Sequence, residues 1–540
     1  MLKISRVQFF CTAVLLCLSI LANAQWNRSP EEMLASTIAN LEENQTVQSL
    51  SQAVRTLQSN IEVSESVQSW VDALVSEATQ EWNAGNTAEA RRRLVQAIAV
   101  QRELPWDEKA EFAGSLLIET NKIVDPSVTF YGQVTQSYPA TYTASDVLTL
   151  HLSLLSQDGP RDLGTIEVSP RDLTEAPWGF SAQLDGVADG PYRLVAEVSD
   201  GGSLIRRLVT NIVTVKDMEA KLAEVEERLA KLNGFESAKA TVLYPFDYAR
   251  VINTGGRELV LRGFVEGGFN LTYDFSEEIA NSFDLLEQVE AGNDPLFRAK
   301  GVTHRHYAFT EAGEIMPYIT YVPSQYDGTK SLPLVVALHG AGNDENTFIL
   351  NRGPAMQEQA EKHGFIIVSP LGYRERGGWG RSMGPGPAAP RATGLPMRMG
   401  MNRSARMSEL SEKDAMNVTE LVAEEYNVDR SRIYLFGNSM GGSGTWHLGS
   451  KYADVWAAIA PCGSPSLGES FFPIEQLKDM PIIYTQGDQD NVERARTMIS
   501  WAKEHGLDIP YYEVENGTHV MAPLDGLAKI FDFLAKQQKQ

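Results

Sequence analysis

The sequence predicts a multidomain protein that ends in an α/β domain, with a mostly parallel sheet and helices on both of its faces. Three observations lead to this fold class. The chain has 540 residues, which is too long for one hydrophobic core. Its texture changes from helical periodicity to alternating apolar residues and back again. In residues 301–540, short apolar runs alternate with helical stretches, an order typical of parallel sheets covered by helices.

Residues 1–24 have the pattern of a secretory signal peptide. Lys3 and Arg6 precede an apolar run at 7–21, and Ala22-Asn-Ala24 provides the small residues of a cleavage site. We therefore expect an exported protein, periplasmic or secreted, whose mature chain begins near Gln25. A retained anchor is the alternative, but the run is shorter than the ~20 apolar residues that span a bilayer. No later segment is apolar enough for a membrane span.

The net charge limits the kinds of partner that we expect, and the cysteines limit the possible disulfides. The formal net charge of -23 becomes -25 once Lys3 and Arg6 are removed, and such a surface repels phosphate backbones. We therefore expect no nucleic acid partner. Cys11 and Cys17 lie in the signal segment, so Cys462 stands alone and is interpreted as a buried structural thiol. Neither a metal nor another cofactor is predicted.

Three regions precede the α/β domain. Residues 25–124 have helix formers and apolar positions three and four apart, which predicts a helical domain. Residues 125–215 contain short alternating runs between turn residues, which predicts an immunoglobulin-like β-sandwich. Residues 216–300 are interpreted as a helical spacer that begins with a helix at 216–232, whose four-three apolar spacing also leaves dimerisation open. The oligomeric state is not predicted.

The α/β domain spans residues 301–540, and its reactive groups belong at the carboxyl ends of the strands. The expected strands are residues 318–322, 334–338, 365–368, 433–436, 456–460, 482–484 and 511–514.

Two segments match the pentad G-x-S-x-G, around Ser439 and around Ser382. A nucleophile elbow needs a strand before the serine and a helix after it, since the sharp turn lifts the hydroxyl above the sheet. Ser439 follows the strand at 433–436 and precedes a helical stretch, whereas Ser382 is followed by Pro-Gly-Pro. The context favours Ser439 as the nucleophile of a serine hydrolase.

A serine hydroxyl needs a base, and in this architecture the chain order is serine, acid, histidine. His447 and His505 fall in helical stretches, whereas His519 lies on a loop after the last expected strand. His519 is therefore the expected base. The acid should follow the strand at 482–484, where Asp488 and Asp490 are both available, and Asp490 is favoured.

The oxyanion of the transition state needs amide donors. The amide of Met440, next to the nucleophile, and that of Ala341, in the glycine-rich turn after the strand at 334–338, are the expected pair. The residues expected to contact the substrate are His339, Trp379 and Arg381.

The segment 373–407 is rich in arginine, with one acid, Glu375. Such a long loop is often functional. We expect either a lid or wall that attracts a carboxylate-bearing substrate, or a cationic loop that pairs with the acidic body of the protein. The arginines are residues 374, 376, 381, 391, 398, 403 and 406.

The motifs of residues 318–536 resemble one branch of the α/β-hydrolase serine esterases, which includes polyhydroxybutyrate depolymerases and feruloyl and acetyl-xylan esterases. The motifs that carry this resemblance are His339-Gly-Ala-Gly, Gly437-Asn-Ser-Met-Gly-Gly442, Gly487-Asp-Gln-Asp-Asn491 and Gly517-Thr-His519. In that branch the acid motif commonly reads His-Gly-x-x-Asp, which maps onto 486–490 and supports Asp490, with Gln486 as a departure.

The resemblance implies ester hydrolysis through an acyl-enzyme, on a small-molecule or polysaccharide-linked ester. Two alternatives stay open. A serine peptidase of the prolyl-oligopeptidase kind shares this catalytic domain, and a binding protein could use an inactive hydrolase scaffold.

Overall fold

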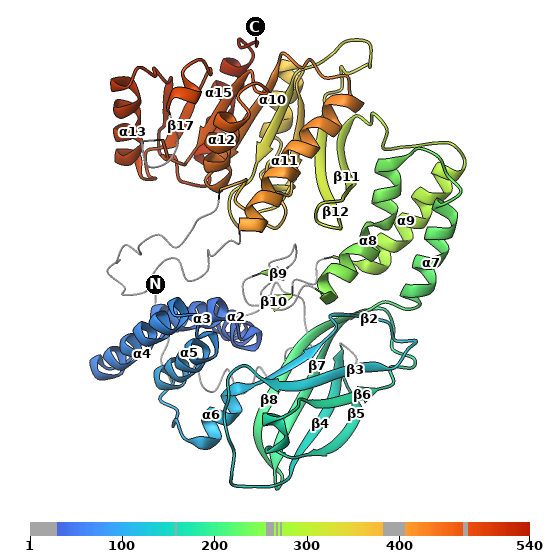
Figure 1. Cartoon of the computed structure of the whole chain (residues 1–540), viewed down its shortest axis with the longest axis vertical. Coiled ribbons are helices and arrows are strands. Elements are labelled where there is room, and N and C mark those ends of the chain that lie inside the picture. Colours follow the sequence, from blue (N-terminus) through green and yellow to red (C-terminus); the bar gives the residue numbers. More distant parts are fainter. Residues whose placement is uncertain are drawn as a thin grey trace. The chain divides into compact units, whose positions relative to one another are not determined.

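The structure, a computed structural model, describes most of the chain, and the residues cluster into two compact units (Figure 1). Of the described residues, those within 30–223 and 249–278 belong to the first unit, and those within 224–248, 279–381 and 405–539 belong to the second unit. The predicted signal peptide at 1–24, Ser382 and the middle of the arginine-rich segment lie outside the described residues. Those described are 30–156, 159–254, 264–265, 268–269, 273–381, 405–467 and 474–539.

The first unit begins with a group of helices. They are α2 (Pro30–Asn44), α3 (Val47–Asn60), α4 (Glu65–Asn83), α5 (Thr87–Gln101) and α6 (Glu108–Ser115). The starts of three of them are fixed by capping side chains, because Thr46, Ser64 and Asp107 each accept a hydrogen bond from an amide of the first turn. Residues such as Leu50, Val54, Leu94 and Ile98 join in one buried core.

The strands of the first unit form two sheets around a common core. The strands are β1 (Leu116–Thr120), β2 (Ile123–Val124), β3 (Phe130–Gln136), β4 (Leu148–Ser156), β5 (Gly159–Val168), β6 (Trp178–Ala182), β7 (Gly190–Asp200) and β8 (Ser203–Thr214). The sheet orders are β1-β3-β6 and β2-β8-β7-β4-β5. Alternate residues of β4, namely Leu148, Leu150, Leu152 and Leu154, are buried, as expected for a strand with one face in the core.

One boundary differs from the sequence-based expectation. Residues 116–124 were expected to be helical, yet they form β1 and β2. Leu116, Leu117 and Ile118 are all buried, and β1 pairs with β3 along its whole length. Pairing across the sheet therefore outweighs the local helical tendency of this segment.

Three helices follow the sandwich strands: α7 (Met218–Leu229), α8 (Glu236–Thr254) and α9 (Phe275–Glu290). Strand β9 (Phe264–Val265) pairs antiparallel with β10 (Gly268–Phe269). In the second unit, Asp247 of α8 accepts a 2.7 Å hydrogen bond from the amide of Ile315, and Tyr244 stacks on His306. This part of α8 therefore packs on the first strands of the large sheet.

The second unit is built on an eight-stranded sheet of order β11-β12-β14-β13-β15-β16-β17-β18. Strands β11 and β12 run antiparallel to their neighbours, whereas β14 to β18 pair in parallel. The strands are β11 (Gly301–Phe309), β12 (Glu314–Val322), β13 (Leu334–Leu338), β14 (Ile366–Pro370), β15 (Ile433–Asn438), β16 (Ala458–Cys462), β17 (Tyr484–Gly487) and β18 (Tyr511–Val514).

Helices cover both faces of this sheet, and β13 is therefore buried on both sides. Leu334, Val336 and Leu338 join one core, with α11 (Ala405–Glu425), α12 (Met440–Lys451) and α13 (Val492–Glu504). Val335 and Ala337 join the opposite core, with α10 (Ala355–His363), α14 (Ala522–Asp525) and α15 (Leu527–Leu534). The result is an α/β fold with three layers (Figure 1).

Strand β11 was not expected from the sequence. It carries Arg305, which is fully buried and pairs with Glu425 of α11 through two hydrogen bonds, one of them 2.8 Å long. A buried charge needs such a partner. The strand was missed because an arginine in its middle does not fit the apolar pattern expected of a buried strand.

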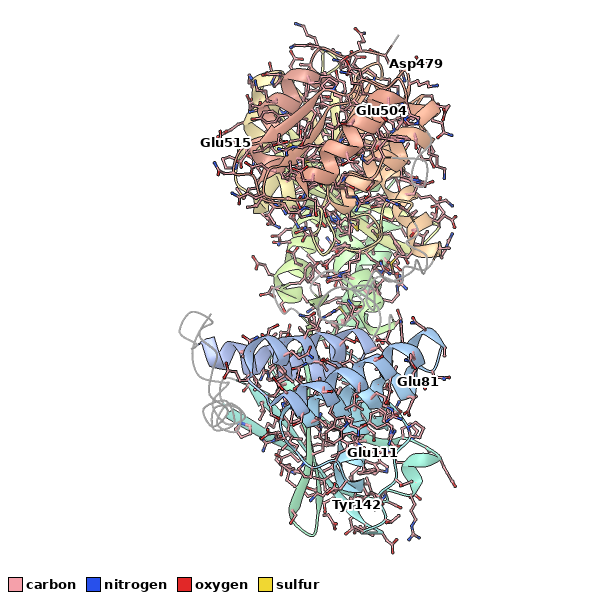
Figure 2. All side chains as sticks on the ribbon, turned by 90° about the vertical axis from the view of Figure 1, so that its left-hand side faces the viewer. Glu81, Glu111, Tyr142, Asp479, Glu504 and Glu515 are labelled. Carbon is pink, nitrogen blue, oxygen red and sulfur yellow. The ribbon has the colours of Figure 1, made fainter. Side chains whose placement is uncertain are left out.

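Acidic side chains are exposed on the second unit, as Asp479, Glu504 and Glu515 illustrate (Figure 2). Within the described part of the chain, no helix combines the length and the apolarity needed to cross a bilayer.

Candidate active site

The turn between β15 and α12 holds Ser439 in a strained conformation. Its φ of 59° and ψ of -114° are unusual for a residue with a side chain. The surrounding glycines make the turn possible, since a Cβ on Gly441 would lie 1.9 Å from the carbonyl oxygen of Leu338. A Cβ on Gly437 would lie 2.4 Å from the carbonyl oxygen of Gly441. The turn therefore presents the Ser439 hydroxyl at the carboxyl edge of the sheet.

His519 lies between Ser439 and an acid. Its Nε2 is 2.9 Å from Oγ of Ser439, and its Nδ1 is 2.6 Å from Oδ2 of Asp490. These residues follow three parallel strands, β15, β17 and β18, so their carboxyl ends bring the side chains together. This arrangement can move a proton from the serine hydroxyl to the imidazole.

The two candidate acids have different environments. Asp490 faces His519, whereas Oδ2 of Asp488 accepts a 2.9 Å hydrogen bond from the amide of Asn516. Asp488 therefore ties the loop before His519 to the end of β17, and only Asp490 reaches the imidazole.

Gln486 supports the acid, a role that the sequence did not reveal. The side chain is fully buried, and its Nε2 donates to Oδ2 of Asp490 over 2.8 Å as well as to the Asp490 carbonyl. Its Oε1 accepts a 2.6 Å hydrogen bond from the Tyr484 hydroxyl, which fixes the amide with its nitrogen toward the carboxylate. The sequence showed that a glutamine lies four residues before Asp490, but it did not show that its side chain points toward the carboxylate.

The loop after β13 lies against the nucleophile. A Cβ on Gly340 would be 3.4 Å from Cβ of Ser439, and the next residue, Ala341, is exposed. The amide of Gly342 donates to the carbonyl of Glu375 over 3.0 Å, which fixes the far side of this loop. Met440 is the first residue of α12, whose positive end points at the same place. Amides of Ala341 and Met440 can therefore both be offered to an oxyanion.

His339 and Trp379 are buried, whereas the sequence-based expectation placed them against the substrate. Both side chains are 0% exposed. Nε2 of His339 lies 2.7 Å from the carbonyl oxygen of Leu371, and burial lowers the pKa of this imidazole. The indole of Trp379 donates to the His339 carbonyl over 3.2 Å and packs against Gly372 and Gly444. The two rings thus support the oxyanion loop from beneath.

The described ends of the arginine-rich segment contain paired cations. Arg374 is buried and forms a bidentate ion pair with Glu314, at 2.7 and 2.8 Å, while its guanidinium stacks on Tyr373. Arg406 pairs with Glu409 at 3.2 Å. For these two arginines the structure favours pairing with the body of the protein. Arg381 is half-buried at the edge of the described residues, and its contact with substrate stays a prediction.

Two acids of α11 bind neighbouring segments, Asp414 the one that leads to Trp379 and Glu412 the end of α12. Asp414 is fully buried and accepts hydrogen bonds of 2.6 Å from the amide of Gly372 and from the Tyr307 hydroxyl. Glu412 accepts from Nε2 of His447 over 2.6 Å. Burial opposes ionisation of Glu412, but hydrogen bonds from His447, Lys451 and Tyr452 prevail and lower its pKa to about 2.

Three serine hydroxyls form a hydrogen-bonded row from α12 to the loop after β16. Oγ of Ser443 lies 2.7 Å from Oγ of Ser464, which lies 2.9 Å from Oγ of Ser466. Cys462 is buried, and burial raises the pKa of its thiol, so this cysteine is unreactive as expected. In the part of the chain that the structure describes, no group of three or more His, Cys, Asp or Glu side chains could hold a metal ion.

Comparison with known proteins agrees with this geometry. Residues 310–507 match the model of the Esterase family, described as "Putative esterase". A bifunctional acetylxylan esterase/xylanase from Neocallimastix patriciarum is 30% identical over 175 residues. The α/β domain is therefore similar to the serine esterases of the α/β-hydrolase type. A feruloyl esterase B from Neurospora crassa is 27% identical to this esterase domain over 144 residues.

The matches to the curated relatives are partial. They cover 32% and 26% of this chain, and the chain spans 21% and 41% of the relatives' own lengths. Solved structures similar to the chain include a thermostable esterase, with 16% identity, a TM-score of 0.34 and coverage of 72% of this chain and 90% of that chain. A ferulic acid esterase from Anaeromyces mucronatus has 16% identity, a TM-score of 0.32 and coverage of 44% and 90%.

Proposed function

We propose that the protein is an exported serine hydrolase that cleaves a carboxylic ester through an acyl-enzyme. Ser439 is the nucleophile, His519 the general base and Asp490 the acid that orients it. The observation that carries this proposal is the continuous hydrogen-bond path from Oγ of Ser439 to the Asp490 carboxylate, with links of 2.9 and 2.6 Å.

Acylation follows from this geometry. Nε2 of His519 takes the hydroxyl proton as Oγ of Ser439 bonds to the ester carbonyl carbon, and the Asp490 carboxylate stabilises the imidazolium. The carbonyl oxygen becomes an oxyanion beside the amides of Ala341 and Met440. The imidazolium then gives its proton to the alkoxide oxygen as the carbon–oxygen bond of the ester breaks.

Deacylation uses the same groups in reverse. His519 takes a proton from a water molecule, whose oxygen attacks the acyl carbon, and the proton returns to Oγ of Ser439 as the carboxylic acid leaves. No cofactor takes part in either half of the reaction.

For the substrate, we propose a small-molecule or polysaccharide-linked ester. Support comes from the relatives, whose names specify acetylxylan and feruloyl esters. The hydroxyls of Ser443, Ser464 and Ser466 give the neighbourhood of the nucleophile further hydrogen-bonding capacity.

A fluorophosphonate label followed by peptide mapping tests the nucleophile. We expect the label on Ser439, and loss of labelling in Ser439→Ala. Hydrolysis of p-nitrophenyl acetate should fall by roughly 10⁴-fold or more in Ser439→Ala and His519→Ala. A folded protein that is labelled elsewhere, or that keeps its rate in both variants, contradicts the proposal. A prolyl peptide hydrolysed faster than acetyl, feruloyl and hydroxyalkanoate esters would instead indicate a peptidase.

Export is also part of the proposal, supported by the pattern of residues 1–24. Amino-terminal sequencing of the protein recovered from the native host should give a mature chain that begins near Gln25. A mature protein that retains Lys3 and Arg6 would contradict processing at this site.

A further inference from the structure

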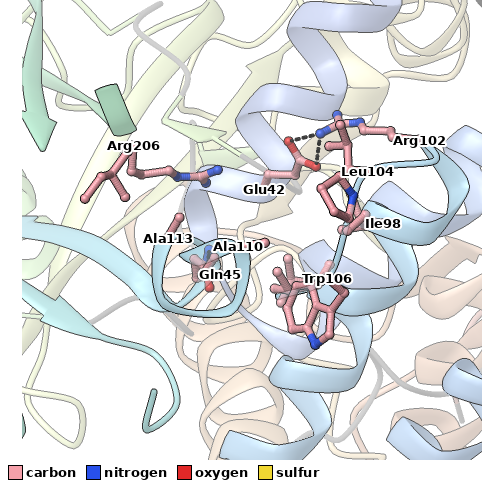
Figure 3. A pocket seen from close by; sticks show the side chains of 15 residues that line it. Glu42, Gln45, Ile98, Arg102, Leu104, Trp106, Ala110, Ala113 and Arg206 are labelled. Atoms are coloured by element: carbon pink, nitrogen blue, oxygen red, sulfur yellow. Dashed lines mark hydrogen bonds and ion pairs between the residues drawn. The ribbon is translucent and has the colours of Figure 1, made fainter. Parts of the chain in front are cut away.

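The first unit contains a cavity that plays no part in the chemistry above. It has a volume of about 180 Å³ and is lined mainly by apolar side chains of the helices and of β8 (Figure 3). Ile98 and Trp106 form apolar parts of its wall, and Ile205 contributes another from β8. Charged groups, Glu42, Arg102 and Arg206, gather in one part of the wall.

Arg206 is an unpaired cation in this wall. Its side chain forms no hydrogen bond or ion pair with any described residue, and its Nε is buried without an acceptor. The side chain as a whole is partly exposed, so an anion that binds there would replace water around the guanidinium with a charged hydrogen-bond partner. The neighbouring Arg207 has such a partner, since its Nε donates to Glu197 over 2.7 Å. Adjacent residues of a strand point to opposite faces. The arginine on the cavity face of β8 therefore lacks a partner, whereas the arginine on the opposite face has one.

The acids near Arg206 do not neutralise it. Glu42 pairs with Arg102, at 2.8 Å. Glu43 lies close enough for its charge to interact with Arg206, Arg193 and Lys122, but burial raises its pKa to about 7. Near neutral pH this carboxyl is therefore only partly ionised, and a positive charge remains at the cavity.

We propose that this cavity binds a small planar carboxylate, with the carboxylate on Arg206 and the ring against the apolar wall. The planar fork of a guanidinium matches a carboxylate with two parallel hydrogen bonds. A cavity of about 150 Å³ holds one benzene molecule, so a space of about 180 Å³ suits a single ring. A charged group at one part of an apolar pocket is also the usual arrangement of small-molecule sites.

The probe is 4-fluorobenzoate, observed by fluorine NMR with the full-length mature protein. The Ser439→Ala variant serves as the parent protein, and Ser439 is not among the residues that line the cavity. We expect a Kd on the order of 1 mM, as suits a ligand of this size. Arg206→Gln should weaken binding by at least about tenfold, because the paired carboxylate loses its partner. Arg206→Lys should weaken it less, since the charge remains.

The matched control is Arg207→Gln, on the opposite face of the same strand, which should leave the Kd within about twofold. Ala113→Leu places extra atoms in the cavity and should abolish binding while Arg206 stays in place. The neutral analogue 4-fluorobenzyl alcohol should bind at least about tenfold more weakly than the acid. Thermal melting of each variant checks that the first unit is folded.

Three results would overturn the proposal. They are equal binding by Arg206→Gln and its parent, equal binding of acid and alcohol, and no binding by the folded parent at about 10 mM probe. Since the assay measures binding in an inactive background, its outcome is independent of whether the esterase activity is found.

Discussion

Gln486 donates a hydrogen bond from its side-chain amide to the carboxylate of Asp490, at 2.8 Å. The accepting oxygen is the same Oδ2 that faces His519. Tyr484 fixes the orientation of the amide through its hydroxyl. Gln486, which departs from the common family motif, therefore holds the acid in place.

Gln486→Ala should lower kcat for p-nitrophenyl acetate by about 10- to 100-fold, with little change in KM. Loss of a hydrogen bond to a charged group costs about 1.5–3 kcal/mol, and about 1.4 kcal/mol corresponds to a tenfold change in rate.

The matched control for Gln486→Ala is Asp488→Asn, in the same turn but on the amide of Asn516. It should change kcat by less than about threefold. A rise in KM as large as the fall in kcat would contradict this role of Gln486.

Trp379→Phe tests the corrected role of the buried tryptophan. The ring is kept but the indole N–H that reaches the His339 carbonyl is lost. We expect kcat to fall by about 3- to 30-fold, since a buried carbonyl loses its donor at a cost of about 1–2 kcal/mol. The ratio of kcat/KM between acetyl and feruloyl esters should stay constant. A change in that ratio of more than about fivefold would indicate that Trp379 contacts the substrate.

Gly441→Ala tests the close approach at the elbow. The new methyl would lie 1.9 Å from the backbone oxygen of Leu338, which cannot move without breaking the sheet edge. We expect destabilisation of at least about 3 kcal/mol or failure to fold, measured by urea denaturation.

The control for Gly441→Ala is Gly449→Ala, on the same helix. There the nearest atom is the end of the Ile459 side chain, at 2.7 Å, which can rotate away. This variant should fold and keep most of its activity. Equal stability of the two variants would show that the elbow tolerates a wider approach.

The sequence could predict the residues whose position follows from strand order. Ser439 and His519 each follow a strand, and parallel strands bring their carboxyl ends to one edge. The structure indeed joins them through a 2.9 Å contact. The choice of Asp490 over Asp488 also agrees with the geometry, because only Asp490 reaches the ring.

The sequence could not predict which way a loop side chain points. His339 and Trp379 lie in the correct loops, but both turn into the interior, where they hold the backbone. Strand β11 was missed because its buried Arg305 reads as a surface residue unless its partner Glu425 is known. Both errors concern tertiary contacts that local patterns do not contain.

Asp414 predicts how the stability of the esterase domain depends on pH. It is fully buried beneath the segment that leads to Trp379, and it accepts hydrogen bonds from Tyr307 and Gly372. Burial raises its pKa from 3.8 to about 6, against the opposing effect of these hydrogen bonds. The folded state therefore holds the proton more tightly than the unfolded state, and stability should fall as the pH rises through about 4 to about 6.

Asp414→Asn cannot titrate, and it should remove this contribution. The free energy of unfolding of the wild type, relative to Asp414→Asn, should decrease by about 2–3 kcal/mol between about pH 4 and about pH 7. Urea denaturation followed by tryptophan fluorescence measures it, with the exposed Asp479→Asn as the control for a change of surface charge. A difference that stays constant or grows over this range would mean that the hydrogen bonds, and not burial, decide the charge of Asp414.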